Sequence, residues 1–239
     1  MKTIITLPLP FDKWDVFAPF IKRFCDTFKQ FEPGADCEVW GMCCSGYISD
    51  EVELWFDGIN AVFHKYPEDG CDIGSAQYAA DMLKENAFMV NMTSRCYFHR
   101  PGWLKRLLEA REKHGDGMYS TFASWEGGTP HLGTRAYCLD SHTFQRYPHI
   151  IDTREKGQKF EVGEWCITSW FRQQSMPTMQ VTWSGEQEQA DWRKPDNIFR
   201  KGDQSNCLVF DRHTDLYQDA DDVEKLRLNG IAAPAETKT

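Results

Sequence analysis

The sequence predicts an α/β protein with a single domain, in which helices flank a mostly parallel central sheet. Its 239 residues are close to the length at which single cores stop growing, about 250 residues. Strand-like apolar runs alternate with amphipathic segments along the first hundred residues, which is typical of strand–helix–strand units. With 9 Trp and 16 Phe, the chain can bury enough apolar surface to exclude a disordered protein. We expect one domain over residues 1–219 and a C-terminal tail over residues 220–239.

The first predicted unit is a strand followed by an amphipathic helix. Residues 2–9 (KTIITLPL) form a β-rich run that ends at prolines, so a loop should follow at the carboxyl end of this strand. Phenylalanines then recur at three- and four-residue steps between residues 17 and 31, which predicts a helix. Pro19 fits this helix if it lies in the first turn.

The same pattern then continues. Residues 37–44 (CEVWGMCC) form an apolar run suited to a strand buried on both faces. Residues 61–66 and 87–92 are predicted strands, and the small residues within 75–86 predict a helix between them. Pro101 should lie in the first turn of another helix that ends near His114. Strands are expected within 117–125, 135–139 and 178–183, and a helix over 164–174.

Charge and targeting signals limit the classes of function. The formal net charge of −9 argues against a protein that works by gripping phosphate backbones. The sequence contains no apolar run of 18 residues and nothing that resembles a signal peptide. We therefore expect a cytoplasmic protein without a transmembrane segment.

The nine cysteines are interpreted as buried free thiols. They are odd in number and contain no C-x-x-C pair, whereas zinc sites and disulfide scaffolds usually show close or even spacing. A Cys/His nucleophile stays open as an alternative, although no local pattern supports it.

Residues 66–104 carry a family resemblance. The segment YPEDGCDIGSAQYAADMLKENAFMVNMTSRCYFHRPGWL resembles the central part of GT-A-fold nucleotide-sugar glycosyltransferases of the family-2 type. It combines a Gly-containing turn, a helix of small residues, a buried strand that ends in a polar cluster, and a helix with a proline in its first turn. The resemblance extends over residues 3–215 as a pattern of elements. It implies that the nucleotide lies beyond the carboxyl ends of the strands, near Thr6 and Pro8, and that the polar cluster faces the donor diphosphate.

The polar cluster departs from that family in one respect. An Asp-x-Asp motif, which holds Mg²⁺ or Mn²⁺, is usual at this place, but the window here contains no carboxylate. Its polar residues are Asn91, Thr93, Ser94 and Arg95. The resemblance thus implies either a metal held by other groups or metal-independent binding, with Arg95 pairing with phosphate oxygens. A solvated Arg95 at the strand end is the alternative.

Two glutamates are candidates for the catalytic base. Inverting members of this fold use an acidic residue near the start of a helix after the acceptor-binding strands, and Glu161 and Glu164 stand at a comparable place. We assign Glu164 as the base and Glu161 as an acceptor ligand, an order that could be reversed. The two would share a face if one helix includes both. A first-turn capping role is the alternative for each.

A later polar segment supplies the remaining cations. Arg200, Lys201 and Arg212 form a local basic cluster in an acidic protein and are predicted to contact the diphosphate. The Asp203-Gln204 pair resembles a motif of some retaining members and is assigned to the acceptor, which keeps retention open beside inversion. His213 is a candidate metal ligand, with a packed or capping histidine as the alternative.

The aromatic residues suggest an acceptor surface, because indole rings stack on sugars. Trp125, beside a Gly-Gly loop, and His131 are the candidates, although most Trp residues are simply buried.

These observations predict an enzyme that transfers a hexosyl or deoxyhexosyl group from a nucleotide-diphosphate sugar to a hydroxyl of a glycan or glycoconjugate, as in polysaccharide biosynthesis. A GT-A-like domain that binds sugar, nucleotide or a partner protein without catalysis is the alternative from a non-enzyme class. A nucleotidyltransferase is less favoured, because a Gly-rich, Lys-containing loop should follow its first strand, and LPLPFDKW does not supply one.

Overall fold

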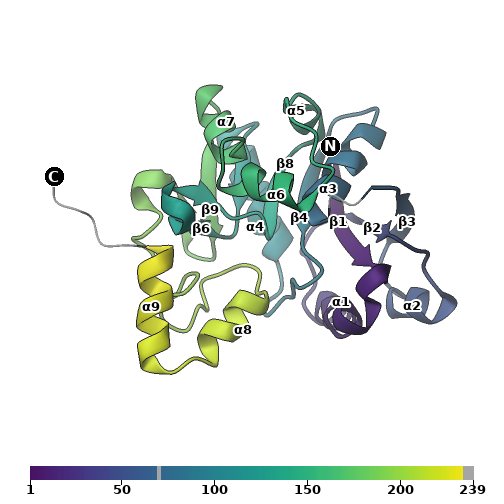
Figure 1. The fold of residues 1–239 in the computed structure, drawn as a ribbon, viewed down its shortest axis with the longest axis horizontal. Coiled ribbons are helices and arrows are strands. Elements are labelled where there is room, and N and C mark those ends of the chain that lie inside the picture. Colours follow the sequence, from purple (N-terminus) through teal and green to yellow (C-terminus); the bar gives the residue numbers. More distant parts are fainter. Residues whose placement is uncertain (69–70, 234–239) are drawn as a thin grey trace.

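The computed structural model describes residues 1–68 and 71–233, without the side chain of residue 71. An eight-stranded sheet crosses the molecule in the order β10-β9-β5-β8-β4-β1-β2-β3 (Figure 1). Its strands are β1 (Lys2–Pro10), β2 (Glu38–Cys44), β3 (Ala61–Tyr66), β4 (Ala87–Met92), β5 (Met118–Ser120), β8 (Ala136–Asp140), β9 (Thr178–Thr182) and β10 (Gly185–Gln187). The predicted α/β class with a mostly parallel sheet is confirmed.

The first half of the sheet is parallel and the second half is mixed. β1 pairs in parallel with β2 on one side and with β4 on the other, and β2 pairs in parallel with β3. β8 runs antiparallel to both β4 and β5, and β5 is parallel to β9. The start of β8 therefore lies at the same edge of the sheet as the carboxyl end of β4.

One face of the sheet is covered by α1 (Trp14–Gln30), α2 (Asp50–Trp55) and α4 (Trp103–His114). Alternate residues of β1, such as Ile5 and Leu7, join this core, together with Phe24 from α1 and Leu107 from α4. Such alternation is expected, because successive strand residues point to opposite faces. Pro19 lies inside α1 and not in its first turn, since the helix begins three residues earlier than the phenylalanine pattern does.

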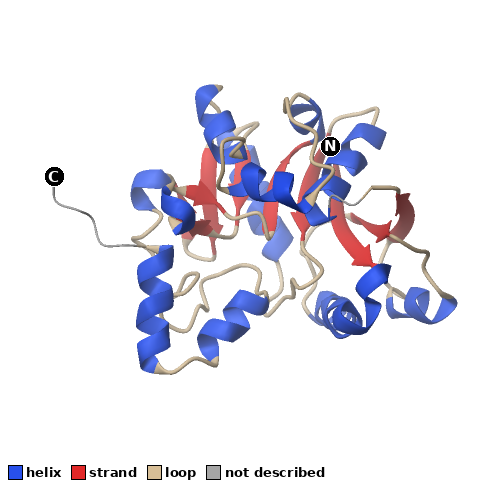
Figure 2. Cartoon of the chain, viewed as in Figure 1, coloured by secondary structure: helices blue, strands red, loops and turns tan. Residues whose placement is uncertain are grey.

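The other face is covered by α3 (Cys71–Met82), α5 (Ser141–Gln145), α6 (Arg154–Glu161) and α7 (Ile167–Gln173), so helices flank the sheet on both sides (Figure 2). Ala76, Ala79 and Ala80 of α3 are fully buried in this core with Met89 of β4. Their small side chains let the helix pack closely on the strands. The predicted helix over 75–86 thus starts earlier and ends earlier than its residues indicated.

The predicted helix over 164–174 divides differently. Residues 164–166 lie outside any helix, α7 starts at Ile167, and the preceding α6 ends at Glu161. The predicted strand over 117–125 is split into β5 and β6 (Ala123–Ser124), which pairs with β7 (His131–Leu132) in a separate two-stranded sheet. Three short 3₁₀ turns complete the elements: η1 (Phe11–Lys13), η2 (Glu126–Gly128) and η3 (Gln189–Asp191).

The segment predicted to be a tail contains a packed helix. α8 (Arg212–Gln218) and α9 (Asp222–Ala232) lie together at the lower left of Figure 1. The carbonyl oxygen of Ala232 accepts a hydrogen bond from the backbone N–H of Trp125 at 2.9 Å, and the Asn229 side chain donates to the carbonyl of Arg200 at 2.9 Å. Only residues 234–239 of the predicted tail lie outside the described residues.

Two further expectations concern cysteines and membranes. Cys25, Cys37, Cys43, Cys96, Cys138, Cys166 and Cys207 are free thiols, and all of them but the half-buried Cys37 are buried. The side chain of Cys71 lies outside the described residues. Within residues 1–68 and 71–233, no helix is both long and apolar enough to span a bilayer.

Candidate functional site

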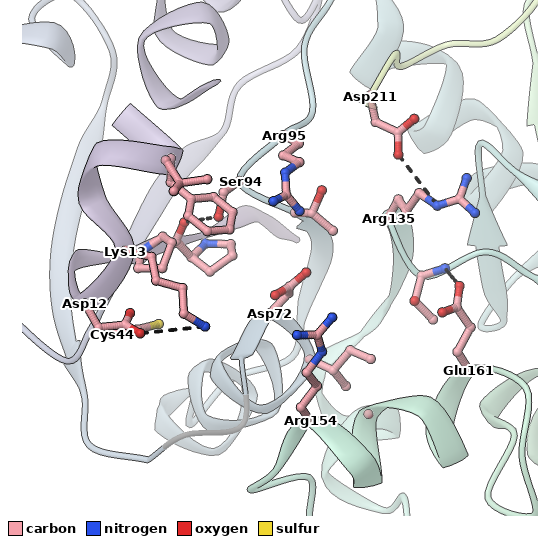
Figure 3. A pocket seen from close by; sticks show the side chains of 18 of the residues that line it. Asp12, Lys13, Cys44, Asp72, Ser94, Arg95, Arg135, Arg154, Glu161 and Asp211 are labelled. Carbon is pink, nitrogen blue, oxygen red and sulfur yellow. Dashed lines mark hydrogen bonds and ion pairs between the residues drawn. The ribbon is translucent and has the colours of Figure 1, made fainter. Parts of the chain in front are cut away.

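A cavity of about 530 Å³ lies at the carboxyl edge of the parallel strands. Pro8 and Pro10 of β1, Cys44 of β2 and residues 93–95 after β4 form its floor. Lys13 and Phe17 near the start of α1, residues 154–161 of α6, and His213 of α8 form its walls (Figure 3). In open α/β sheets ligands bind in the crevice outside these strand ends, and the volume is in the range of small-molecule sites.

Backbone and side-chain hydrogen bonds fix the floor. The Ser94 hydroxyl donates to the carbonyl of Pro8 at 2.8 Å, which joins the ends of β4 and β1. The backbone N–H of Thr93 donates to the carbonyl of Arg135 at 2.9 Å, which joins the end of β4 to the start of β8. Thr6 and Asn91, both predicted donor-site residues, are buried in the sheet and hydrogen bond to each other at 2.7 Å. They support the floor but do not line the cavity.

Arg95 lies in the cavity and makes no side-chain hydrogen bond within residues 1–68 and 71–233. Its guanidinium carbon lies 4.5 Å from the ring centre of Phe17 and 5.5 Å from that of Phe20. Its Nε is buried and makes no hydrogen bond within the described residues. Burial, followed by the neighbouring charge of Arg212, lowers the pKa of Arg95. An anion entering the cavity would relieve both conditions.

Asp72 and Arg154 extend this polar wall. Both line the cavity, and in Figure 3 the carboxylate of Asp72 lies between Arg95 and Arg154. Burial raises the pKa of Asp72, although the charges of Arg95 and Arg154 oppose the shift. Arg154 is exposed at the start of α6, where Thr153 caps the helix. Neither residue was predicted: Asp72 lies within residues 66–104 but outside the polar cluster of that segment, and Arg154 belongs to a segment that carries no motif.

The opposite wall is built around Arg135 and the start of α8. Nε of Arg135 lies 3.6 Å from Oδ2 of Asp211. The other carboxylate oxygen of Asp211 accepts the backbone N–H groups of His213 and Thr214 at 2.9 and 3.1 Å, so this residue caps α8. Burial, with the charge of Arg135, lowers the pKa of His213 to about 4. The imidazole is therefore neutral at physiological pH.

Of the two predicted glutamates, the structure brings only Glu161 into the cavity. Its Oε1 accepts a hydrogen bond from the backbone N–H of Thr134 at 3.2 Å. The side chain of Glu164 is 65% exposed and pairs with Lys159 at 3.2 Å. The two residues do not share a helix face, because α6 ends at Glu161 and a turn follows.

The predicted basic cluster of residues 200–212 does not line the cavity. Arg200 is buried, and its guanidinium pairs with Glu126 at 3.2 Å. Lys201 donates to the carbonyl of Pro195 at 3.0 Å and pairs with Asp196 at 3.0 Å. Arg212 is exposed near Arg95, whose pKa its charge lowers. Arg212 therefore acts on the cavity by its charge, and Arg200 does so through His213, whose pKa the charge of Arg200 lowers.

The predicted acceptor residues also lie elsewhere. The Trp125 ring packs edge-on against Trp192, with ring centres 5.8 Å apart. His131 is buried, and its Nδ1 is 2.8 Å from the carbonyl of Thr129. Gln204 is fully buried; its amide oxygen accepts the backbone N–H of Arg200, and its amide nitrogen donates to the carbonyl of Thr214. The exposed carboxylate of Asp203 accepts from Ser205. None of these side chains is a lining residue of the cavity.

His213 is the predicted metal ligand, and it lines the cavity. The nearest carboxylate along the chain, Asp211, is engaged by α8 and Arg135. Among the described residues, no group of three or more His, Cys, Asp or Glu side chains could hold a metal ion.

Comparisons with known proteins give fold likenesses only. A scan against protein-family models found no match, and a search of curated proteins found none. Among solved structures, TarS of S. aureus matches with 12% identity and a TM-score of 0.48, over 71% of this chain and 33% of the TarS chain. The mannosyltransferase PcManGT of Pyrobaculum calidifontis, in complex with GDP-Man and Mn²⁺, matches with 10% identity and a TM-score of 0.46, over 63% of this chain and 49% of that one.

A third similar structure is a CMP-2-keto-3-deoxy-manno-octonic acid synthetase complexed with CTP. It matches with 12% identity and a TM-score of 0.46, over 72% of this chain and 87% of that chain. At these identities and TM-scores the three structures assign no activity to this chain, and the match spans about a third of the TarS chain.

Proposed function

We propose that this protein is a glycosyltransferase that moves a sugar from a nucleotide-diphosphate donor to a hydroxyl of a glycan or glycoconjugate. The proposal rests on two side chains that line one cavity at the carboxyl edge of the parallel strands, Arg95 and Glu161. Arg95 makes no side-chain hydrogen bond within the described residues and suits a diphosphate leaving group. The carboxylate of Glu161 suits a base for the acceptor hydroxyl.

Three arginines form the proposed diphosphate site. Arg95 and Arg154 line the cavity, and the charges of Arg154 and Arg212 both lower the pKa of Arg95. None of the three makes a side-chain hydrogen bond or ion pair within residues 1–68 and 71–233. The site needs such cations because no Asp-x-Asp follows β4. Two oxygens of a phosphate group can accept two parallel hydrogen bonds from one guanidinium, so these side chains would stabilise the negative charge that develops on the departing diphosphate.

Glu161 is the proposed catalytic base. Its carboxylate would take the proton of the acceptor hydroxyl while the acceptor oxygen bonds to the anomeric carbon and the bond from that carbon to the diphosphate breaks. Attack from the face opposite the diphosphate inverts the anomeric centre. We assign this role to Glu161 and not to Asp72, because Asp72 lies between two of the phosphate-binding arginines (Figure 3). Asp72 would contact the donor, because its carboxylate can accept hydrogen bonds from the ribose or sugar hydroxyls.

Titration calorimetry with UDP, GDP and CDP, in EDTA and in Mn²⁺, tests the donor site. We expect one of these nucleotides to bind with an affinity that EDTA does not change by more than about twofold. Binding that requires Mn²⁺ would contradict the arginine site, and a failure of all three to bind would contradict the proposed function.

A binding domain without catalysis is the second candidate, favoured by the missing Asp-x-Asp after β4. Both candidates predict nucleotide binding, but only the enzyme releases free nucleoside diphosphate from its nucleotide sugar. Measuring that release across a panel of nucleotide sugars separates them. We also propose that the protein is cytoplasmic, which fractionation of the cells that produce it would test.

A further inference from the structure

A second arginine that lines the cavity, Arg135, also makes no side-chain hydrogen bond within the described residues. The Arg135 side chain is 15% exposed, and its Nη1 is buried without a hydrogen bond. The guanidinium carbon lies 4.4 Å from the ring centre of Phe199 and 5.4 Å from that of Phe122, so its faces are held by aromatic rings. Within the described residues, the side chain makes no hydrogen bond, and its one ion pair, to Asp211, is long at 3.6 Å.

Arg135 and Arg95 face different ends of the cavity although their backbones are close. The carbonyl of Arg135 accepts the N–H of Thr93, two residues before Arg95. The Arg95 side chain then turns toward α1, where it stacks on Phe17, whereas the Arg135 side chain turns toward Phe199 and Asp211 (Figure 3). One bound diphosphate at Arg95 therefore leaves Arg135 without a ligand.

The Arg135 end is also the end of the proposed base. Thr134, whose N–H donates to Glu161, immediately precedes Arg135. The charged side chains around this end are Arg135, Arg200 and Arg212 on the positive side and Asp211, Glu126 and Glu161 on the negative side, and all three cations lower the pKa of His213. Although these charges balance in number, the buried Nη1 of Arg135 makes no hydrogen bond within the described residues.

We infer that Arg135 forms a second anion subsite in this cavity, which binds a carboxylate carried by the transferred sugar or by the acceptor. This inference rests on the proposed function. A planar carboxylate fits because a guanidinium can donate two parallel hydrogen bonds to it, and because Arg135 is held rigid by the rings of Phe122 and Phe199. The enzyme would then act on uronic-acid-type sugars in preference to their neutral counterparts.

The test compares the wild type with Arg135→Gln, and with Arg100→Gln as a matched control. Arg100 also stacks on an aromatic ring, at 4.5 Å from Trp183, but it is exposed and outside the cavity. Two donors that differ only at C6, the glucuronate and glucose conjugates of whichever nucleoside diphosphate binds in the calorimetric test, are measured with neutral and uronic-acid-containing acceptor oligosaccharides. Binding of that nucleoside diphosphate alone is measured by calorimetry on all three proteins, which checks that the variants are folded.

We expect kcat/KM for the acidic substrate to exceed that for its neutral counterpart by about 10- to 100-fold in the wild type and in Arg100→Gln, and this preference to vanish in Arg135→Gln. A preference seen with the donors places the carboxylate on the transferred sugar, and one seen with the acceptors places it on the acceptor. Equal kcat/KM values for acidic and neutral substrates in the wild type would overturn the subsite, as would a preference that survives in Arg135→Gln.

Failure of the proposed function would look different from failure of this inference. If UDP, GDP and CDP all fail to bind, the donor site is wrong. The subsite is then tested directly by saturation-transfer NMR with free glucuronate and glucose: glucuronate contacts that Arg135→Gln abolishes support it, and equal signals from the two sugars overturn it.

Discussion

Two polar segments, residues 93–95 after β4 and residues 200–206 before α8, contain side chains that the sequence predicts to meet a donor diphosphate, Arg200 and Lys201 in the second case. Only the first segment lines the cavity. In the part of the chain that the structure describes, the Arg95 side chain makes no hydrogen bond. Arg200 and Lys201, in contrast, are engaged by Glu126 and by backbone carbonyls. The difference follows from position. Side chains at the carboxyl end of a parallel strand face the crevice, while a long irregular segment must use its polar groups to satisfy its own buried backbone.

Gly202 shows how closely the 200–206 segment folds on itself. Its φ is +62°, and a Cβ at this position would lie 2.2 Å from Oδ1 of Asn197. A glycine flanked by charged and amide residues therefore indicates here a tight turn that is held by its own side chains. The sequence pattern that suggested ligand binding is the pattern of a structural loop.

The largest expected effect concerns the base. Glu161→Gln should reduce sugar transfer by about 10²- to 10⁴-fold, because general-base catalysis is worth that much, with little change in the affinity for nucleoside diphosphate. Steady-state transfer assays measure kcat. Glu164→Gln is the matched control, since Glu164 is exposed outside the cavity, and equal losses in both variants would contradict the assignment.

The second-largest effect is expected from removing the charge of Arg95. Arg95→Gln should weaken binding of nucleoside diphosphate by about 10- to 100-fold, because hydrogen bonds to charged groups contribute about 1.5–3 kcal/mol. Calorimetry measures the change, and Arg100→Gln should bind like the wild type. If Arg95→Gln retains full affinity, residues 93–95 are no more functional than the 200–206 segment.

The same substitution in the second segment should affect stability instead. Arg200→Gln should lower the free energy of unfolding by about 1–3 kcal/mol, because it removes a buried guanidinium paired with Glu126. Nucleotide affinity should stay within about twofold of the wild type after a small shift in charge. Urea unfolding and calorimetry measure the two quantities. Unchanged stability with lost affinity would reverse the contrast between the two segments.

The smallest effect is a dependence of stability on pH. The pKa of His213 is about 4 in the folded protein and about 6.5 in an unfolded chain, so below pH 6.5 the unfolded state gains a proton that the folded state does not. His213 therefore favours folding above about pH 6.5, and this contribution, about 1 kcal/mol after solvent screening, is lost as the pH falls to 4. Urea unfolding of wild type and His213→Gln from pH 7.5 to 4 should show a smaller fall for the variant. Parallel curves would contradict this.

The parallel half of the fold was predictable because its strands are short, continuous apolar runs. The boundaries of β3 and β4 agree with the predicted ranges, and those of β1 and β2 differ by one residue. α6 was missed because its eight residues are mostly polar and Phe160 is its only described buried side chain. α9 was missed for the same reason: Val223 and Leu226 are exposed, so its sequence lacks a core-facing stripe.

The candidate site was predictable only where it follows a strand. Residues 93–95 were found from the end of β4, but Arg135 precedes a strand that runs antiparallel, and its place beside β4 depends on a pairing across more than forty residues. Asp72 and Arg154 meet through the packing of α3 and α6. Glu164 was preferred over Glu161 because the turn after α6 was not recognised; at Gly163 a Cβ would lie 2.6 Å from Cα of Lys159.

The cavity is lined by residues from Pro8 to His213, so almost the whole chain must be in place before a ligand can bind. Binding is then thermodynamically linked to global folding: a ligand at one hundred times its Kd should add about 2.7 kcal/mol to the free energy of unfolding. The slowest-exchanging amides of β1, β4 and β8 should therefore gain protection together when ligand is added. Ligand-induced protection would identify the correct nucleotide before any acceptor is known.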